Sequence, residues 1–238
     1  MEREAMSFVE KFKEMGFKVL ENEPLDPETL IKVLVAGIKS NEEVYGPIFS
    51  KRAVDYALKF ISGKIGESAP SNIETLEQLT EYLVSIVEKY PRAYCAVLYA
   101  EIMVEAELQG RIGAAIQISE IKWARGLLGG AKKDVNVDVE KIILDMNKTT
   151  RALKINPNDG SGYRVNEDGT LDMFFVNCYF MDVCKQVLKE GHRRVDGRMY
   201  CPSSSGICRY FRGVTGREWD YDLLEFDKPY CTSKIYML

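Results

Sequence analysis

The residues of this chain best suited to chemistry are its cysteines, and they are unevenly distributed. The chain has 238 residues and six cysteines, of which only Cys95 precedes residue 178. The others are Cys178, Cys184, Cys201, Cys208 and Cys231. Thiols are retained mainly for metal binding, nucleophilic reactivity or disulfide formation. The clustering therefore points to a metal or iron–sulfur site, a reactive thiol or a disulfide framework.

Four of the clustered cysteines are candidate metal ligands. Zinc and iron–sulfur centres take about four soft ligands in a tetrahedral arrangement. We expect these thiols at the ends of strands or in a loop rich in Pro, Ser and Gly, where several segments can converge on one point. The candidate ligands are Cys178, Cys201, Cys208 and Cys231. Cys184 is expected inside a helix, as a core residue. The chain lacks the tight C-x2-C pair that delivers two sulfurs from one turn.

A catalytic thiol is the alternative use of this region. Cys201 precedes Pro202 and a Ser-Ser-Ser-Gly stretch, which predicts an exposed loop. A nucleophilic cysteine needs a lowered thiol pKa, supplied by a helix N-terminus or a nearby cation. His192 is the only histidine of the chain, so a Cys–His mechanism would pair it with Cys201. The competing interpretation of His192, next to two arginines, is a solvated cation after a helix.

Helices are expected over most of the first 130 residues. Apolar residues at helical spacing predict a helix over 4–16. Asp26-Pro27-Glu28 marks the next helix start, because aspartate caps free amides and proline suits the first helical position. Ser71 and Glu74 have the spacing of a capping box, which predicts another start. Further helices are expected over 48–64, 93–109 and 112–128. The apolar run within 93–109 leaves a buried strand as an alternative.

After residue 130 the pattern changes to a mixture of strands and helices. The pair Asp168-Gly169 marks the turn of a hairpin. Its strands are expected at 163–165 and 171–176, between helices over 139–153 and 180–190. A short helix or loop at 208–214 and two strands at 222–226 and 232–237 complete the chain. The predicted fold is α+β, with a mostly helical N-terminal half and a C-terminal antiparallel sheet with packed helices.

The predicted domain organisation follows this change of pattern. We expect a helical region over 1–130 and an α+β, cysteine-rich ligand- or metal-binding region over 131–238. The two regions form either separate domains or one continuous domain. The helical region would support a homodimer or cover a ligand pocket.

Charge and hydropathy exclude several classes of partner. The formal net charge is −4, whereas duplex-binding proteins usually present a basic face, so no nucleic-acid partner is expected. A transcription regulator would need a helix-turn-helix among the N-terminal helices, and the acidic balance disfavours it. The charged N-terminal residues predict no secretory signal, and no apolar run reaches 18 residues, so no membrane partner is expected. The expected location is cytoplasmic, where disulfides are disfavoured.

Three segments of the C-terminal third carry recognisable motifs. Leu171–Cys178 ends in Asn-Cys, Gly206–Gly213 contains Cys followed by aromatic residues and Gly, and Pro229–Ile235 contains the last cysteine. Together they resemble the vinyl-4-reductase-like domain family of small-molecule-binding domains. The family's closing strand is usually preceded by Glu-x-x-Cys, whereas here Glu225 lies six residues before Cys231. The same segments also resemble the aminothiazoline-carboxylate hydrolase family, which implies an enzyme.

The vinyl-4-reductase-like resemblance implies an α+β ligand-binding module in which cysteines hold a structural zinc in some members. It implies Cys178, Cys208 and Cys231 as ligands, with Cys201 as an addition. Aromatic residues are dense in the same region, which suits a pocket for an apolar or aromatic molecule. We therefore expect a binding or sensing module for such a molecule, with a cysteine site for zinc or an iron–sulfur cluster. The alternative is a thiol-dependent hydrolase or an iron–sulfur redox enzyme.

Overall fold

The computed structural model describes residues 7–21, 26–66, 68–109, 138–150, 160–178, 180–194, 197–226 and 228–238. The chain divides into two compact units, each assembled from separate segments. The sheet unit comprises 1–24, 124–181 and 201–238, and the helical unit comprises 25–123 and 182–200. The sequence predicted a division at residue 130. In the structure, the N-terminal segment belongs to the sheet unit and 182–200 belongs to the helical unit.

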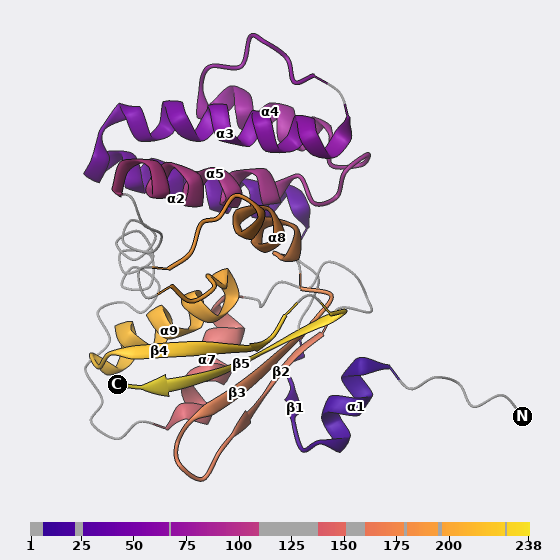
Figure 1. The fold of residues 1–238 in the computed structure, drawn as a ribbon, viewed down its shortest axis with the longest axis vertical. Helices are drawn as coiled ribbons and strands as arrows, with labels where there is room; N and C mark the ends of the chain where they lie inside the picture. The colour runs from indigo at the N-terminus through magenta and orange to yellow at the C-terminus, as the bar shows by residue number, and fades with distance from the viewer. Residues whose placement is uncertain are drawn as a thin grey trace, which may run out of the picture. The chain divides into compact units, whose positions relative to one another are not determined.

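The sheet unit contains a five-stranded antiparallel sheet, which confirms the predicted α+β class (Figure 1). Its strands follow the spatial order β1-β2-β3-β5-β4. They are β1 Lys18–Val19, β2 Gly160–Val165, β3 Leu171–Val176, β4 Trp219–Glu225 and β5 Tyr230–Met237. The predicted hairpin is β2–β3, and Gly169 at its turn has φ 78°, a left-handed conformation that glycine adopts without strain. The two predicted C-terminal strands are β4 and β5.

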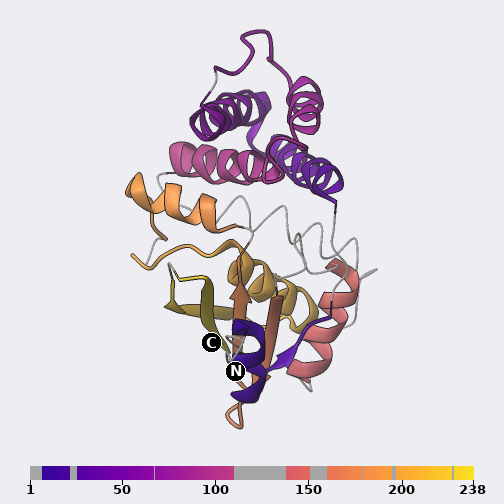
Figure 2. The ribbon, with the colours of Figure 1, turned by 90° about the vertical axis from the view of Figure 1, so that its right-hand side faces the viewer.

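Helices pack on both faces of this sheet (Figures 1 and 2). Side chains alternate between the faces along each strand, so directly paired residues share a face. Tyr163 bonds Glu140 of α7, which spans Val139–Thr150, and its partner Met173 points to the same side. Phe174 points to the other side, toward α1, which spans Phe8–Glu14. Helix α9, Pro202–Thr215, covers the α7 face.

The α1 face is closed by aromatic stacking. The rings of Phe12 and Phe174 are parallel, with centroids 4.2 Å apart, and Phe17 meets Phe174 edge-on. Gly162 lies opposite Phe174 in the β2–β3 register. A Cβ atom there would overlap both the Phe174 ring and the carbonyl oxygen of Lys18. Glycine is therefore required where β1 and this ring both approach β2.

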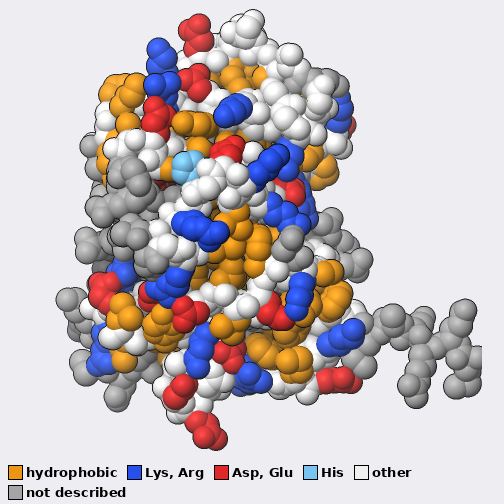
Figure 3. Space-filling view, viewed as in Figure 1, with side chains coloured by type: hydrophobic (Ala, Val, Ile, Leu, Met, Phe, Trp, Pro, Cys, Tyr) orange, Lys and Arg blue, Asp and Glu red, His pale blue; other side chains and the backbone are white. Residues whose placement is uncertain are grey.

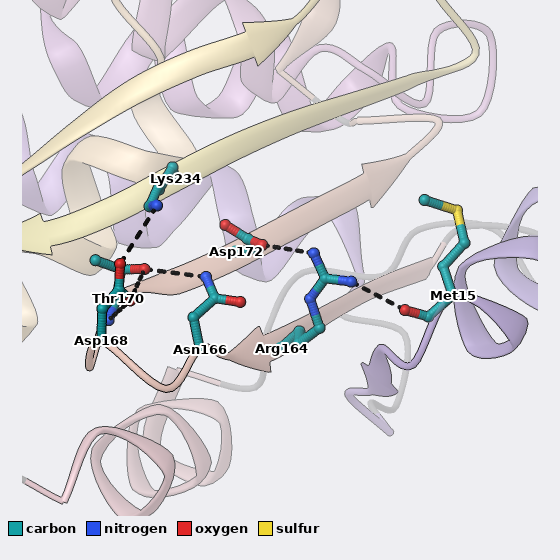
Figure 4. A network of polar contacts seen from close by, with 7 residues as sticks. All are labelled: Met15, Arg164, Asn166, Asp168, Thr170, Asp172 and Lys234. Carbon is teal, nitrogen blue, oxygen red and sulfur yellow. Dashed lines mark hydrogen bonds and ion pairs between the residues drawn. The ribbon is translucent and has the colours of Figure 1, made fainter.

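On the same face of the sheet, polar contacts join the end of α1 to strands β2 and β3 (Figure 4). Arg164 donates one bond to Asp172 at 2.8 Å and another to the carbonyl oxygen of Met15 at 3.0 Å. Its guanidinium also lies 4.6 Å from the ring centroid of Phe17. In the hairpin turn, Asp168 accepts bonds from the amide and hydroxyl of Thr170. The network anchors the end of α1 to β2 and orders the turn.

The helical unit contains α2–α5 and α8. Their bounds are α2 Pro27–Tyr45, α3 Pro47–Ile65, α4 Leu76–Ser85, α5 Tyr94–Gln109 and α8 Met181–Lys189. The predicted start of α2 is confirmed, since Asp26 accepts the amide of Thr29 at 2.8 Å. The predicted capping box of α4 is wrong by four residues. Thr75 and Gln78 form it, because only this pair immediately precedes the buried stripe that begins at Leu76.

Two further predictions concern the helical segments. The ambiguous run 93–109 is a helix, α5, and is buried over most of its length. The helix predicted over 112–128 lies outside the described residues, as do the last residues of the helix predicted over 139–153. None of the described helices combines the length and apolarity needed to span a membrane. On the face drawn in Figure 3, basic and acidic side chains of the described residues are interspersed.

Candidate functional site

The four candidate cysteines are all buried, and two of them do not lie where the sequence predicted. The segment from Pro202 to Gly206 was expected to be an exposed loop, but it is the first part of α9. Cys201 is the N-cap residue of this helix and Cys208 lies within it. The prediction was wrong because Pro202 occupies the first helical position, where proline is favoured, and the serines that follow are buried.

The side of α9 that faces the sheet is defined by its contacts. Ser204 bonds Ser233 of β5 through their hydroxyl groups at 2.9 Å. Near the other end of the helix, Thr215 accepts a bond from the Trp219 indole of β4 at 3.0 Å. Cys208 lies one turn after Ser204 and therefore on the same side. Its position is that of a core residue packed between α9 and the sheet.

The helical spacing also bears on the predicted zinc site. Cys201 and Cys208 are separated by seven residues, which is about 10 Å along a helix axis at ~1.5 Å per residue. Two sulfurs bound to one zinc lie within about 4.6 Å, because each Zn–S bond is about 2.3 Å. The predicted set of four cysteines therefore does not fit a single zinc ion. Among the described residues, no group of three or more His, Cys, Asp and Glu is arranged to hold a metal ion.

The iron–sulfur alternative stays a prediction.

The structure instead forms what we call the thiol–hydroxyl cluster, at the end of β3 and the start of α9. Its members are Cys178, Cys201, Ser203, Ser204 and Ser233. The sulfur of Cys178 lies 3.9 Å from the hydroxyl oxygen of Ser203. The sulfur of Cys201 accepts the amide of Ser204 at 3.5 Å. These groups come from β3, α9 and β5, which lie far apart in the sequence.

Tyr221 supports this cluster from β4. The backbone amide of Cys201 donates a hydrogen bond to the Tyr221 hydroxyl at 2.9 Å. Tyr221, Ser233 and Cys231 all project from the face that α9 covers, since Tyr221 pairs with Ile235, two residues beyond Ser233. Cys231 therefore borders the cluster along β5.

The chemistry of Cys201 is set by its burial. Burial, with a further contribution from neighbouring Cys178, raises the pKa of the Cys201 thiol to about 11. Hydrogen bonds from the Ser204 side chain and from the amides of Ser204 and Ser203 oppose this rise only in part. At neutral pH the group is a protonated thiol, which is a poor nucleophile. The arrangement therefore favours hydrogen bonding by Cys201 over thiolate catalysis. Its predicted partner His192 belongs to the other unit, and that pairing stays a prediction.

Sequence reasoning missed the hydroxyl members of this cluster. From the sequence alone, the run Ser203–Ser205 is predicted to lie in a loop. The sequence did contain a signal for Ser233, because Cys231, Ser233 and Ile235 alternate in the last strand and all three are buried. A period of two places them on one face, which would have marked Ser233 as a buried hydroxyl. Tyr221 carried no comparable signal.

Comparisons with known proteins add no relatives: no family model, no curated protein and no solved structure matches this chain. The resemblance of the C-terminal segments to the vinyl-4-reductase-like domains therefore remains a prediction from three short motifs.

Proposed function

We propose that the sheet unit is a binding module for a small apolar or aromatic molecule that carries a hydrogen-bonding group. The observation that carries this proposal is the burial of three consecutive serines, Ser203, Ser204 and Ser205, in the first turns of α9. A hydroxyl removed from water is destabilising unless it is hydrogen-bonded. A helix start that only packed on a sheet would be more stable with alanine or larger apolar residues there.

The cluster retains hydrogen-bonding capacity at one point. Ser204 and Ser233 satisfy each other, whereas the Ser203 hydroxyl has only the 3.9 Å contact with Cys178 among the described residues. A thiol is also a weaker cap than the oxygen acceptors usual at this position. The amide end of α9 therefore keeps a partial positive charge that favours an electron-rich ligand group. Ser203 is the residue expected to bond that group.

Aromatic residues next to the cluster suit the apolar part of such a molecule. Tyr221 contacts the start of α9, and Phe175 pairs with Cys231 across β3 and β5 on the same face. Both aromatic side chains are buried. Rings of this kind contribute most of the contact area in sites for small apolar ligands. The polar end would meet Ser203 while the apolar part contacts these rings.

The test uses two probes that differ only in one hydrogen-bonding group. 2-Naphthol and 2-methylnaphthalene are titrated into the full chain, and the melting temperature and the dissociation constant are measured. We expect 2-naphthol to bind about tenfold more tightly, which corresponds to one additional hydrogen bond. Replacing Ser203 with Ala should abolish that difference, whereas the control Ser40→Ala in α2 should preserve it. Equal binding of both probes, or no binding of either, would contradict the proposal.

A further inference from the structure

The helical unit holds an ion pair with unused bonding capacity. Arg92, in the segment before α5, contacts Asp182 in the first turn of α8, with Nη1 3.3 Å from Oδ2. Their side chains are 30% and 31% exposed, so both remain accessible to a small solute. A single contact uses one nitrogen of the guanidinium and one oxygen of the carboxylate. Among the described residues, the remaining N–H groups of Arg92 and the second oxygen of Asp182 have no hydrogen-bond partner, so they can bind another group.

A buried hydroxyl group lies beside this pair. The oxygen of Tyr90 is buried and has no hydrogen-bond partner among the described residues. Asp182, Arg92 and Cys95 are its charged or polar neighbours, and burial raises the pKa of the Tyr90 hydroxyl. The group therefore stays neutral, able both to donate and to accept. Other tyrosines of this unit differ, since Tyr99 bonds Glu190 and Tyr56 bonds Glu107.

We propose that Tyr90, Arg92 and Asp182 form a binding site for a free α-amino acid. The carboxylate of the amino acid accepts bonds from the free N–H groups of Arg92, and its ammonium donates to the second oxygen of Asp182. The Tyr90 hydroxyl, which has no partner among the described residues, forms a hydrogen bond with one of the two charged ends of the amino acid. In an α-amino acid, a single carbon separates the carboxylate from the ammonium. The two charged ends can therefore reach Arg92 and Asp182 together, because these side chains are already in contact. The four charges then alternate in sign around a closed ring.

The net charge of the site selects this class of ligand. Arg92 and Asp182 sum to zero, so a simple anion or cation would satisfy one of them and leave its own charge uncompensated in a half-buried place. A zwitterion satisfies both and adds no net charge. A peptide does not suit the site, because its ammonium and carboxylate lie at opposite ends of the chain. This inference concerns the helical unit and does not depend on the function proposed for the sheet unit.

The experiment is calorimetric titration of the full chain with glycine, L-alanine, L-leucine and L-phenylalanine. Acetate and methylammonium, at matched ionic strength, each carry only one of the two charges. At least one amino acid should bind saturably, and about tenfold or more tightly than either single-charge probe, because each charged hydrogen bond contributes at least that factor. Saturation by none of the four, or equal binding of acetate, would overturn the proposal.

Two variants locate the binding: the first leaves the ion pair intact, and the second neutralises one of its two members. Tyr90→Phe removes only the hydroxyl and should weaken amino-acid binding about tenfold. Asp182→Asn keeps the shape of the side chain and should weaken it by a larger factor, through loss of the ammonium partner. The matched control is Tyr56→Phe, which removes a hydroxyl from the same unit and should leave the affinity unchanged. Unchanged affinity in a folded Tyr90→Phe protein would show that the amino acid does not bond this hydroxyl, and it would contradict the proposed site.

Discussion

The backbone amide of Cys201 donates a hydrogen bond to the hydroxyl of Tyr221, 2.9 Å away. This amide belongs to the N-cap residue of α9, whose N–H has no acceptor within the helix. The bond joins the start of α9 to β4 and fixes the position of the first helical turn over the sheet. Ser203 and Ser204 are placed in the cluster by this contact together with the Ser204–Ser233 bond.

The first prediction concerns this bond directly. Replacing Tyr221 with Phe removes the acceptor and leaves a buried amide unsatisfied. The free energy of unfolding should fall by about 1–3 kcal/mol, measured by urea denaturation. The control is Tyr163→Phe, whose hydroxyl bonds the partly exposed Glu140 at 2.9 Å. That variant should lose less than about 1 kcal/mol, because water can replace the lost partner. Equal losses in the two variants would show that the Cys201–Tyr221 bond contributes no more to the free energy of unfolding than the Tyr163–Glu140 bond, which would contradict the prediction.

The second prediction concerns alkaline pH. The folded protein raises the pKa of Cys201 from 9.0 to about 11, so the folded state holds the thiol proton more tightly than the unfolded state. The associated stability is complete below pH 9 and is lost as the pH rises through 11. The loss should reach about 3 kcal/mol, at ~1.4 kcal/mol per pKa unit. Cys201→Ser should show a flatter decline over this range in denaturation curves. Between pH 6 and 8 the unfolding free energies of the two proteins should change with pH in parallel, because the Cys201 thiol is protonated in both the folded and the unfolded state.

The third prediction concerns the crowded glycine of β2. Gly162→Ala forces a methyl group against the Phe174 ring and the Lys18 carbonyl oxygen. The protein should lose about 1–3 kcal/mol of unfolding free energy, as is usual for overpacked cores. Gly206→Ala in α9 is the matched control, because nothing lies within 4 Å of the added carbon. It should gain about 0.5–1 kcal/mol from helix propensity. A neutral Gly162→Ala variant would show that β1 does not pack as closely as described.

The fourth prediction concerns the anchor of α1. Arg164→Met removes the bonds to Asp172 and to the Met15 carbonyl oxygen but keeps much of the apolar stem over Phe17. We expect faster hydrogen exchange of the α1 amides and a loss of about 1 kcal/mol, since Arg164 is partly exposed. Lys148→Met, which breaks an exposed pair with Asp145 in α7, should leave α1 exchange unchanged. Unchanged exchange in Arg164→Met would assign the docking of α1 to its aromatic residues alone.

Local patterns in the sequence predicted many of the elements correctly. The start of α2 followed from Asp26-Pro27, because a cap and the first helical position depend on adjacent residues. The β2–β3 hairpin followed from Asp168-Gly169 for the same reason. The two-residue strand β1 could not be predicted, since it exists only through pairing with β2 about 140 residues later. The cap of α4 was misplaced because Ser71 and Thr75 each begin a capping-box pattern, and packing selects between them.

The sequence predicts that Cys178, Cys201, Cys208 and Cys231 converge on one point. The structure brings Cys178 and Cys201 into the thiol–hydroxyl cluster and places Cys208 farther along α9. The helix from Pro202 to Thr215 packs on the sheet through contacts such as the bond from Ser204 to Ser233 of β5, which composition does not reveal. That helix separates Cys201 from Cys208 along its axis and brings Ser203 and Ser204 into the cluster instead.

Adjacent residues alone specify the caps, the hairpin turn and the alternating faces of the strands, because these depend on short-range sterics and hydrogen bonds. The meeting of Cys178, Ser203 and Ser233 depends on the tertiary structure. It requires the pairing of β3 with β5 and the docking of α9 on the sheet. These are long-range interactions, and local sequence patterns do not predict which segments take part in them.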